Sequence, residues 1–148
     1  MLRISKLADY ATAIMHYIFE HPELAITAVQ IATGTGIAVP TVRKVLELVV
    51  AAKLLNSTRG AHGGYELVDK GEDISLAHII EAIDGPIAMV ECALPGNHCN
   101  RKKDCNTKDH WHVVNHIVKG ALSAVPLKHV MNTDHVRSVM SKIGKELL

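Results

Sequence analysis

Hydrophobic residues recur at helical spacing near the start of the chain. Within residues 5–20, SKLADYATAIMHYIFE, apolar residues recur every three or four positions and so share one face of a helix. These positions are Leu7, Ala11, Ile14 and Ile18. Ser5 suits the N-cap, because its hydroxyl can accept a hydrogen bond from the first helical turn. The pattern predicts an amphipathic helix over residues 5–20.

Two shorter helical patterns follow, joined by glycines. Residues 27–33, TAVQIAT, begin with a capping box, and this second helix ends at the glycines of residues 34–36. Pro40 suits the first turn of a third helix. Its inner face is expected to consist of Val42, Val45, Leu46 and Val49. Two short helices joined by a tight glycine turn predict a helix-turn-helix.

A β-hairpin pattern comes directly after the third helix. The glycine-rich segment GAHGG separates LLNSTR from YELV, which is typical of two strands joined by a longer loop. Ser75 then caps the helical segment LAHIIEAID, which GlyPro ends. The order predicts a mainly α protein with a winged helix-turn-helix domain over residues 1–86, in which the hairpin is the wing.

A further apolar stripe lies beyond residue 106. Thr107 or Asp109 begins a long helix, and residues 133–148 form a last amphipathic helix. The long helix carries Trp111, Val114, Val118, Ala121 and Leu122 on one face, and the last helix carries Val136, Val139, Met140 and Ile143. An apolar helix outside a complete small domain usually packs against a partner. We therefore expect residues 107–148 to form a homodimerisation helix followed by a C-terminal helix.

Composition narrows the class of protein. The 148 residues are 48% hydrophobic but only 3% aromatic, with a formal net charge of +1, which favours one compact unit with an aliphatic, helical core. No apolar run reaches the roughly 18 residues that span a bilayer, and the start lacks the features of a signal peptide. We expect a cytoplasmic protein. Without a phosphate loop, paired carboxylates or a nucleophile beside a base, we expect neither an enzyme nor a small-molecule substrate.

The basic residues of the first domain favour DNA binding over a protein-binding winged helix. Thr41, Arg43 and Lys44 lie near the start of the third helix, and Arg59 lies beside the glycines of the wing. Arg43 could pair with guanine O6 and N7, whereas Lys44 and Lys53 suit phosphate contacts. The net charge of +1 does not decide between the two kinds of partner.

All three cysteines of the chain lie in one polar segment, residues 87–106. The spacing Cys92-x6-Cys99-x5-Cys105 lacks the close cysteine pair of most zinc sites and suits a larger iron–sulfur cluster, either 2Fe-2S or 4Fe-4S. An odd number of cysteines in a reducing compartment disfavours disulfides. Structural zinc, three free surface thiols and an iron–sulfur scaffold or carrier remain alternatives.

Three thiolates leave one cluster position for another ligand. The local candidates are His98, His110 and His112, and the alternative is a side chain from the first helix of a partner subunit, such as Asp9. The basic run at residues 101–103 is expected to be solvated.

Four stretches carry a resemblance to a known family. They are RISKLADYA, STRGAHGGYEL, ISLAHIIEAIDGP and the three-cysteine segment followed by a tryptophan-led helix. Over about residues 1–135 the chain resembles the bacterial winged-helix iron–sulfur regulators that include IscR and NsrR, and most of all the branch that regulates the SUF cluster-assembly operon. The resemblance implies a homodimeric transcription factor in which a cluster on the three cysteines adjusts DNA affinity in response to iron–sulfur, redox or nitric oxide status.

The resemblance also assigns DNA contacts. Arg59 matches the wing arginine that enters the minor groove, and residues 39–44 match the base-reading start of the recognition helix. Some members read DNA there with serine, tyrosine and glutamate. This chain instead has Pro40, Thr41, Arg43 and Lys44, so their operator sequence cannot be transferred to it.

Two branches of the family suggest different fourth ligands. In one, a histidine shortly after the third cysteine completes a 2Fe-2S site, and His110 is the nearest match, displaced by two positions. In the other, an aspartate near the N-terminus of the partner subunit completes a 4Fe-4S site. Asp9 matches that position in register and is the preferred candidate.

Overall fold

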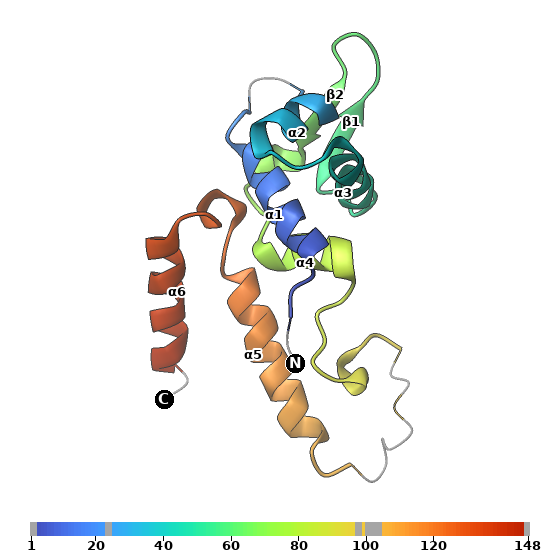
Figure 1. The fold of residues 1–148 in the computed structure, drawn as a ribbon. Helices are drawn as coiled ribbons and strands as arrows, with labels where there is room; N and C mark the ends of the chain where they lie inside the picture. Colours follow the sequence, from blue (N-terminus) through green and yellow to red (C-terminus); the bar gives the residue numbers. More distant parts are fainter. Residues whose placement is uncertain (1–2, 23–24, 97–98, 100–104, 147–148) are drawn as a thin grey trace.

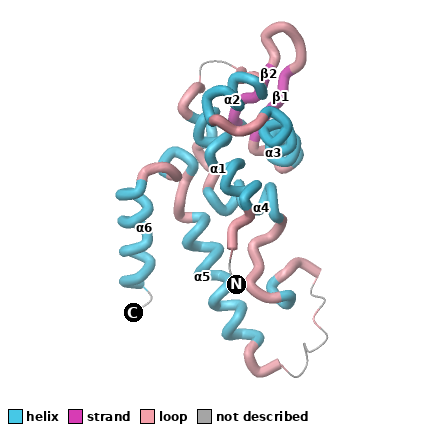
Figure 2. The backbone as a smooth tube through the Cα atoms, viewed as in Figure 1, coloured by secondary structure: helices cyan, strands magenta, loops and turns pink. Residues whose placement is uncertain are grey.

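The computed structural model describes residues 3–22, 25–96, 99 and 105–146. Figure 1 shows α1 to α4 and the hairpin gathered at one end, while α5 and α6 extend away from them. Figure 2 shows how helices dominate the chain. The elements are α1 (Lys6–Phe19), α2 (Ala28–Thr35), α3 (Val39–Ala51), β1 (Leu55–Thr58), β2 (Gly64–Leu67), the 3-10 turn η1 (Val68–Gly71), α4 (Leu76–Asp84), η2 (Glu91–Ala93), α5 (Lys108–Ser123), η3 (Leu127–His129) and α6 (Thr133–Glu146).

The predicted helix caps are confirmed. The hydroxyl of Ser5 accepts a hydrogen bond from the amide of Ala8 at 3.0 Å, which satisfies a free donor at the start of α1. Thr27 and Gln30 form the reciprocal capping box of α2. Gly36 ends α2 in a left-handed conformation with φ 71°, which explains the sharp turn into α3.

The core lies where α1, α3 and α4 pack together with the hairpin. All four residues predicted for the inner face of α3 are buried, and so are Ala11, Ile14 and Ile18 of α1, whereas Leu7 is only partly buried. The hydrophobic periodicity therefore identified the correct faces of both helices.

The wing is a two-stranded antiparallel hairpin. Leu55 pairs with Leu67 and Thr58 pairs with Gly64, so the connecting loop covers residues 59–63, and Gly64 belongs to β2 rather than to the tip. A Cβ atom on Gly64 would lie 2.7 Å from the carbonyl carbon of Ala25. Only glycine allows the hairpin to approach that backbone, where Ile26 and Tyr65 form a bridge.

After α5 the chain returns to the winged helix. The amide of Leu76 donates to the carbonyl of Val125 at 2.8 Å, and the amide of Leu127 donates to the carbonyl of Ile74 at 2.7 Å. The side chain of Leu127 is fully buried in the core formed mainly by α1, α3 and α4. The expected division at residue 86 did not include this returning segment.

Candidate DNA interface and cysteine segment

The start of α3 presents polar side chains away from the core. α3 begins at Val39 with Pro40 in its first turn, and the amide of Thr41 donates to the carbonyl of Ala38 at 2.9 Å. Pro40, Arg43 and Lys44 are exposed, whereas Thr41 is half-buried. Since the buried residues of α3, Val42, Val45, Leu46 and Val49, lie on the opposite face, Arg43 and Lys44 are accessible to a ligand.

Lys53 lies at the other end of the same helix. Its φ is 61°, a left-handed conformation, and its amide donates to the carbonyl of Val50 at 2.9 Å. Lys53 therefore helps to form the turn from α3 into β1, with an exposed side chain.

Arg59 is the first residue of the wing loop and is exposed. Gly60 follows with a φ of 114°, which side chains other than hydrogen rarely allow, and the amide of Gly63 donates to the carbonyl of Gly60 at 3.0 Å. The conformation of this tight loop fixes the backbone position from which the side chain of Arg59 projects.

A cleft of about 450 Å³ separates α3 from the wing and the start of α2. Arg43 and Arg59 both line it, and no acidic residue is among the described residues of its wall. The other lining residues are Thr27, Ala28, Val29, Ser57, Thr58, Gly64 and Tyr65. The predicted DNA contacts Pro40, Thr41, Lys44 and Lys53 do not line it. A cationic cleft between a helix and a hairpin suits a nucleic-acid backbone.

The three cysteines carry thiols rather than disulfides and are half-buried. Cys92 lies in η2, and the Sγ of Cys105 lies 3.5 Å from the hydroxyl of Thr107, the residue that precedes α5. Within the described parts of the chain, no three side chains of histidine, cysteine, aspartate or glutamate are close enough to hold a metal ion. His98 and residues 101–103 lie outside the described residues.

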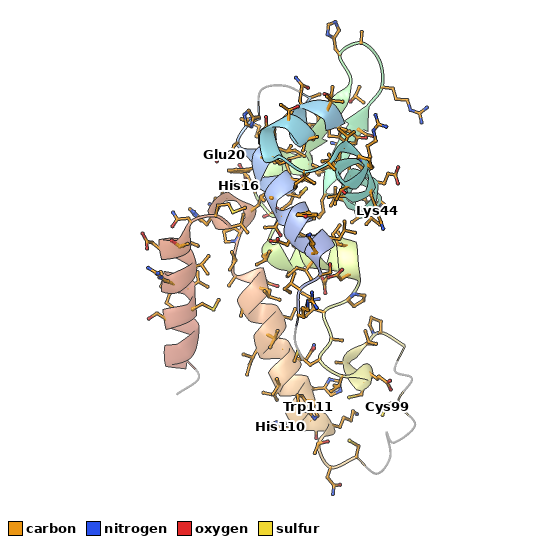
Figure 3. All side chains as sticks on the ribbon, in the orientation of Figure 1. His16, Glu20, Lys44, Cys99, His110 and Trp111 are labelled. Carbon is orange, nitrogen blue, oxygen red and sulfur yellow. The ribbon has the colours of Figure 1, made fainter. Side chains whose placement is uncertain are left out.

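The two candidates for the fourth ligand are both exposed. Asp9 lines a concavity of about 620 Å³ beside the start of α1. His110 lies in the first turn of α5, with its ring edge-to-face with Trp111 at 5.7 Å between centroids. Figure 3 shows His110 and Trp111 near the end of α5 that is farther from the winged helix. Neither candidate forms a metal-binding group with two described cysteines.

Residues 4–133 match the Rrf2 family, which is described as iron-dependent transcriptional regulators. The chain belongs to the Rrf2 family. Protein rrf2 of Nitratidesulfovibrio vulgaris is 32% identical over 74% of both chains. The transcriptional regulator IscR of Photobacterium profundum is 23% identical over 95% of this chain and 82% of that protein. The solved structure of CymR, the global cysteine regulator of B. subtilis, superimposes with a TM-score of 0.66 at 27% identity over 86% of this chain and 95% of that one.

This Rrf2-family protein is a transcriptional regulator and not an enzyme, as predicted from its sequence. The structural likeness to CymR confirms the expected winged-helix fold. Among the described helices, none is long and apolar enough to cross a bilayer.

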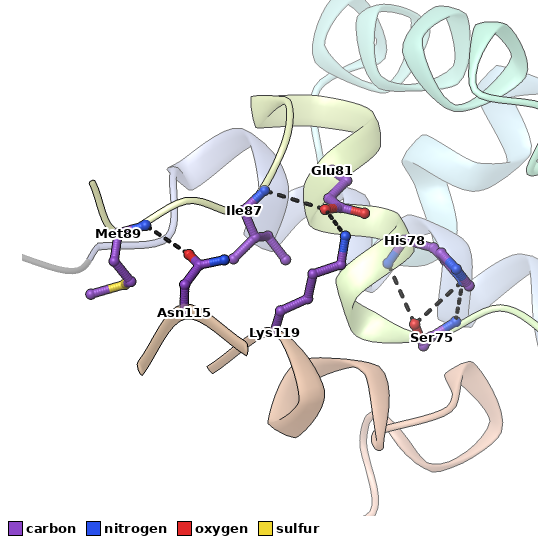
Figure 4. Close-up of polar contacts among 7 residues, drawn as sticks. All are labelled: Ser75, His78, Glu81, Ile87, Met89, Asn115 and Lys119. Carbon is purple, nitrogen blue, oxygen red and sulfur yellow. Dashed lines mark hydrogen bonds and ion pairs between the residues drawn. The ribbon is translucent and has the colours of Figure 1, made fainter. Parts of the chain in front are cut away.

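The cysteine segment of this chain is connected to the winged helix through side chains that the sequence did not single out. Figure 4 shows that Lys119 of α5 donates to Glu81 of α4 at 2.7 Å, and that the amide of Ile87 donates to the same carboxylate oxygen at 3.3 Å. Asn115 of α5 accepts from the amide of Met89 at 2.9 Å. The segment that leads to Cys92 is thus bound to α4 and α5 together.

Glu81 is the centre of this connection. Partial burial raises the pKa of its carboxyl, but the hydrogen bonds from Lys119 and Ile87 and the charges of Lys119 and His78 outweigh burial and lower that pKa below its ordinary value of 4.5. The carboxylate therefore stays ionised and paired at neutral pH. No motif marks Glu81, Asn115 or Lys119, because their roles depend on the packing of α5 beside α4.

Proposed function

We propose that this protein is a homodimeric DNA-binding regulator whose DNA affinity depends on an iron–sulfur cluster. The observation that supports DNA binding is the cleft that both Arg43 of α3 and Arg59 of the wing line, with no acidic residue among its described lining. In this proposal α3 enters the major groove, Arg43 reads base edges, and Arg59 enters the minor groove. Pro40 and Thr41 border the bases, while Lys44 and Lys53 contact phosphates.

The donor set fits an iron–sulfur cluster. Cys92, Cys99 and Cys105 offer three thiols without disulfides, and Cys105 lies just before the N-terminus of α5, whose partial positive charge favours an anionic sulfur ligand. The family's description as iron-dependent supports the same group. Asp9 of a partner subunit or His110 would supply the fourth ligand. Bound there, a cluster supplies redox and nitric oxide reactivity.

The exposed face of α5 supports the homodimer. None of its 16 residues is fully buried, and Trp111 and Val113 are 37% and 60% exposed. Val113, Ile117, Gly120 and Ala124 follow one another at spacings of four, three and four residues, which places them in one row. Such a row of apolar and small side chains is suited to close packing against the same helix of a second copy.

The bonds around Glu81 support a route from the cysteines to the DNA-binding end. A change in the conformation of the segment before Cys92 would move the amides of Ile87 and Met89. These amides donate hydrogen bonds to Glu81 and Asn115, respectively. In a dimer joined through α5, a shift of α5 against α4 changes the separation of the two recognition helices, and two half-sites about one DNA turn apart are sensitive to that separation. We propose the genes of iron–sulfur cluster assembly as targets, on the resemblance in the stretches given above.

The test is anaerobic reconstitution of the full chain with iron and sulfide, followed by metal and sulfide analysis and DNA binding. The DNA probe is a duplex that the reconstituted protein selects from a random-sequence pool. We expect matched iron and sulfide, visible absorption, and a changed affinity in the C92A/C99A/C105A variant. A colourless protein with one zinc ion per chain, or equal affinity of the variant and the reconstituted protein, would refute the cluster-dependent function.

A further inference from the structure

The exposed large apolar side chains of the described residues fall into two places. Six of the seven lie in the N-terminal segment, the cysteine segment, α5, the turn before α6, or α6. They are Ile4, Leu94, Trp111, Val113, Met131 and Met140. The seventh is Val29, which is 56% exposed and lies on α2 at the opposite end of the molecule, beside the wing (Figure 1). Packing of a second copy against α5 leaves Val29 uncovered.

The capping box fixes where Val29 points. Thr27 and Gln30 set the start of α2, and Ile31 and Ala32 are the residues that this helix buries. Val29 comes two residues before Ile31, so its side chain leaves the helix on the side opposite Ile31 and is exposed. There it lines the cleft that Arg43 and Arg59 also line. The cleft thus combines two cations with one apolar side chain.

The chemistry of the cleft matches that of a DNA strand. A strand presents phosphates, which pair with arginine, next to apolar carbon surface in its deoxyriboses and in the methyl groups of thymine. In a helix-turn-helix the first helix crosses the DNA backbone, so its N-terminal turn lies at the edge of the major groove. We propose that Val29 is a DNA-contacting residue that packs on the apolar carbon of the strand in this cleft, an inference that rests on the proposed DNA-binding function.

The experiment compares affinities of full-length variants for the same selected duplex at several salt concentrations. Val29→Ala removes apolar surface from an exposed site, and we expect about three- to tenfold weaker binding with an unchanged salt dependence, because no charge is lost. Val29→Ile keeps the contact and should bind at least as tightly as the wild type. Met131→Ala, which truncates an apolar side chain of similar exposure (51%) outside the cleft, is the matched control and should bind like the wild type.

Substituted DNA distinguishes the two apolar sources. Replacing each thymine by uracil removes only the methyl group. If one replacement weakens wild-type binding but not binding by Val29→Ala, the contact is a thymine methyl; if none does and Val29→Ala is still weaker, it is a deoxyribose. Equal binding by Val29→Ala and the wild type, or an equal loss in Met131→Ala, would overturn the proposal.

The arginines separate this proposal from the function on which it rests. Arg43→Ala and Arg59→Ala should weaken binding and reduce its salt dependence. If they do so while Val29→Ala has no effect, only the role of Val29 fails. If neither arginine matters, the proposed DNA interface and the inference about Val29 both fail.

Discussion

Leu127 lies far along the chain from the helices that surround it, yet its side chain is 0% exposed. α5 runs back toward the winged helix (Figure 3), and the backbone hydrogen bond from the amide of Leu127 to the carbonyl of Ile74 places the leucine in the core. Together with the nearly buried Val125, this leucine therefore ties the end of α5 to the winged helix. Its burial also explains why the winged helix includes a segment that follows the cysteines.

Replacing Leu127 by alanine should lower the free energy of unfolding by about 3 kcal/mol, because a fully buried leucine loses its contacts and leaves a cavity. Urea denaturation of the cluster-free protein at one fixed protein concentration measures the change. Met131→Ala is the control, since Met131 is 51% exposed, and it should cost less than about 1 kcal/mol. Similar losses for both variants would contradict the assigned role of Leu127.

Sequence reasoning found the residues whose roles are local. Hydrogen bonding and periodicity within a single helix predict the caps at Ser5 and Thr27 and the buried face of α3. The structure confirms all three features. The burial of Leu127 could not be predicted, because it depends on α5 bringing the chain back to the winged helix beside Ile74. The meeting of Arg43 and Arg59 with Val29 in one cleft likewise requires the tertiary packing of three elements.

At the scale of elements, α5 is attached to α4 by few but specific bonds. Glu81 accepts from both Lys119 and the amide of Ile87, so one carboxylate holds the helix and the start of the cysteine segment. Asp84, at the end of the same helix, accepts from the hydroxyl of Ser5 at 2.7 Å and so connects α4 to the start of α1. α4 is therefore bound both to the start of the cysteine segment and to the start of α1.

Glu81→Gln should weaken the attachment of α5 in a pH-dependent way. The folded-state pKa of Glu81 lies below 4.5, so its ionised pair stabilises the fold above that pH and is lost as the pH falls through the folded-state value. Because Glu81 and Lys119 are 25% and 48% exposed, the pair should contribute only about 0.5 kcal/mol.

A double-mutant cycle with Lys119→Met measures this coupling from urea denaturation at neutral pH and again below pH 4.5. Coupling should be present at neutral pH and decline in acid. Arg137→Met is the control. It removes the ion pair between Arg137 and Asp134, whose side chain is almost fully exposed and lies near the C-terminal end of the chain. Coupling that grows as the pH falls would contradict the assignment.

At the scale of the whole molecule, the two ends carry surfaces of different chemistry. The winged-helix end presents a cleft with two arginines, whereas the other end presents the apolar row of α5 and a groove of about 620 Å³ between α4, α5 and α6. Much of the stripe predicted from sequence, including Val118 and Leu122, lines that groove. In the row from Val113 to Ala124, Ile117 also lines the groove, whereas Val113, Gly120 and Ala124 do not. These three positions form the surface that we assign to a second copy.

Gly120 offers a direct test of that assignment. A Cβ at Gly120 meets no atom within 4 Å, and glutamate favours a helix more than glycine does, so Gly120→Glu should leave the protomer folded. At a dimer interface the same substitution buries a carboxylate without a partner, and we expect sedimentation velocity to show one chain where the wild type shows two. Gly144→Glu on α6, where a Cβ is equally unobstructed, should remain dimeric. A Gly120→Glu protein that sediments as a dimer would rule out packing of this row against a second copy.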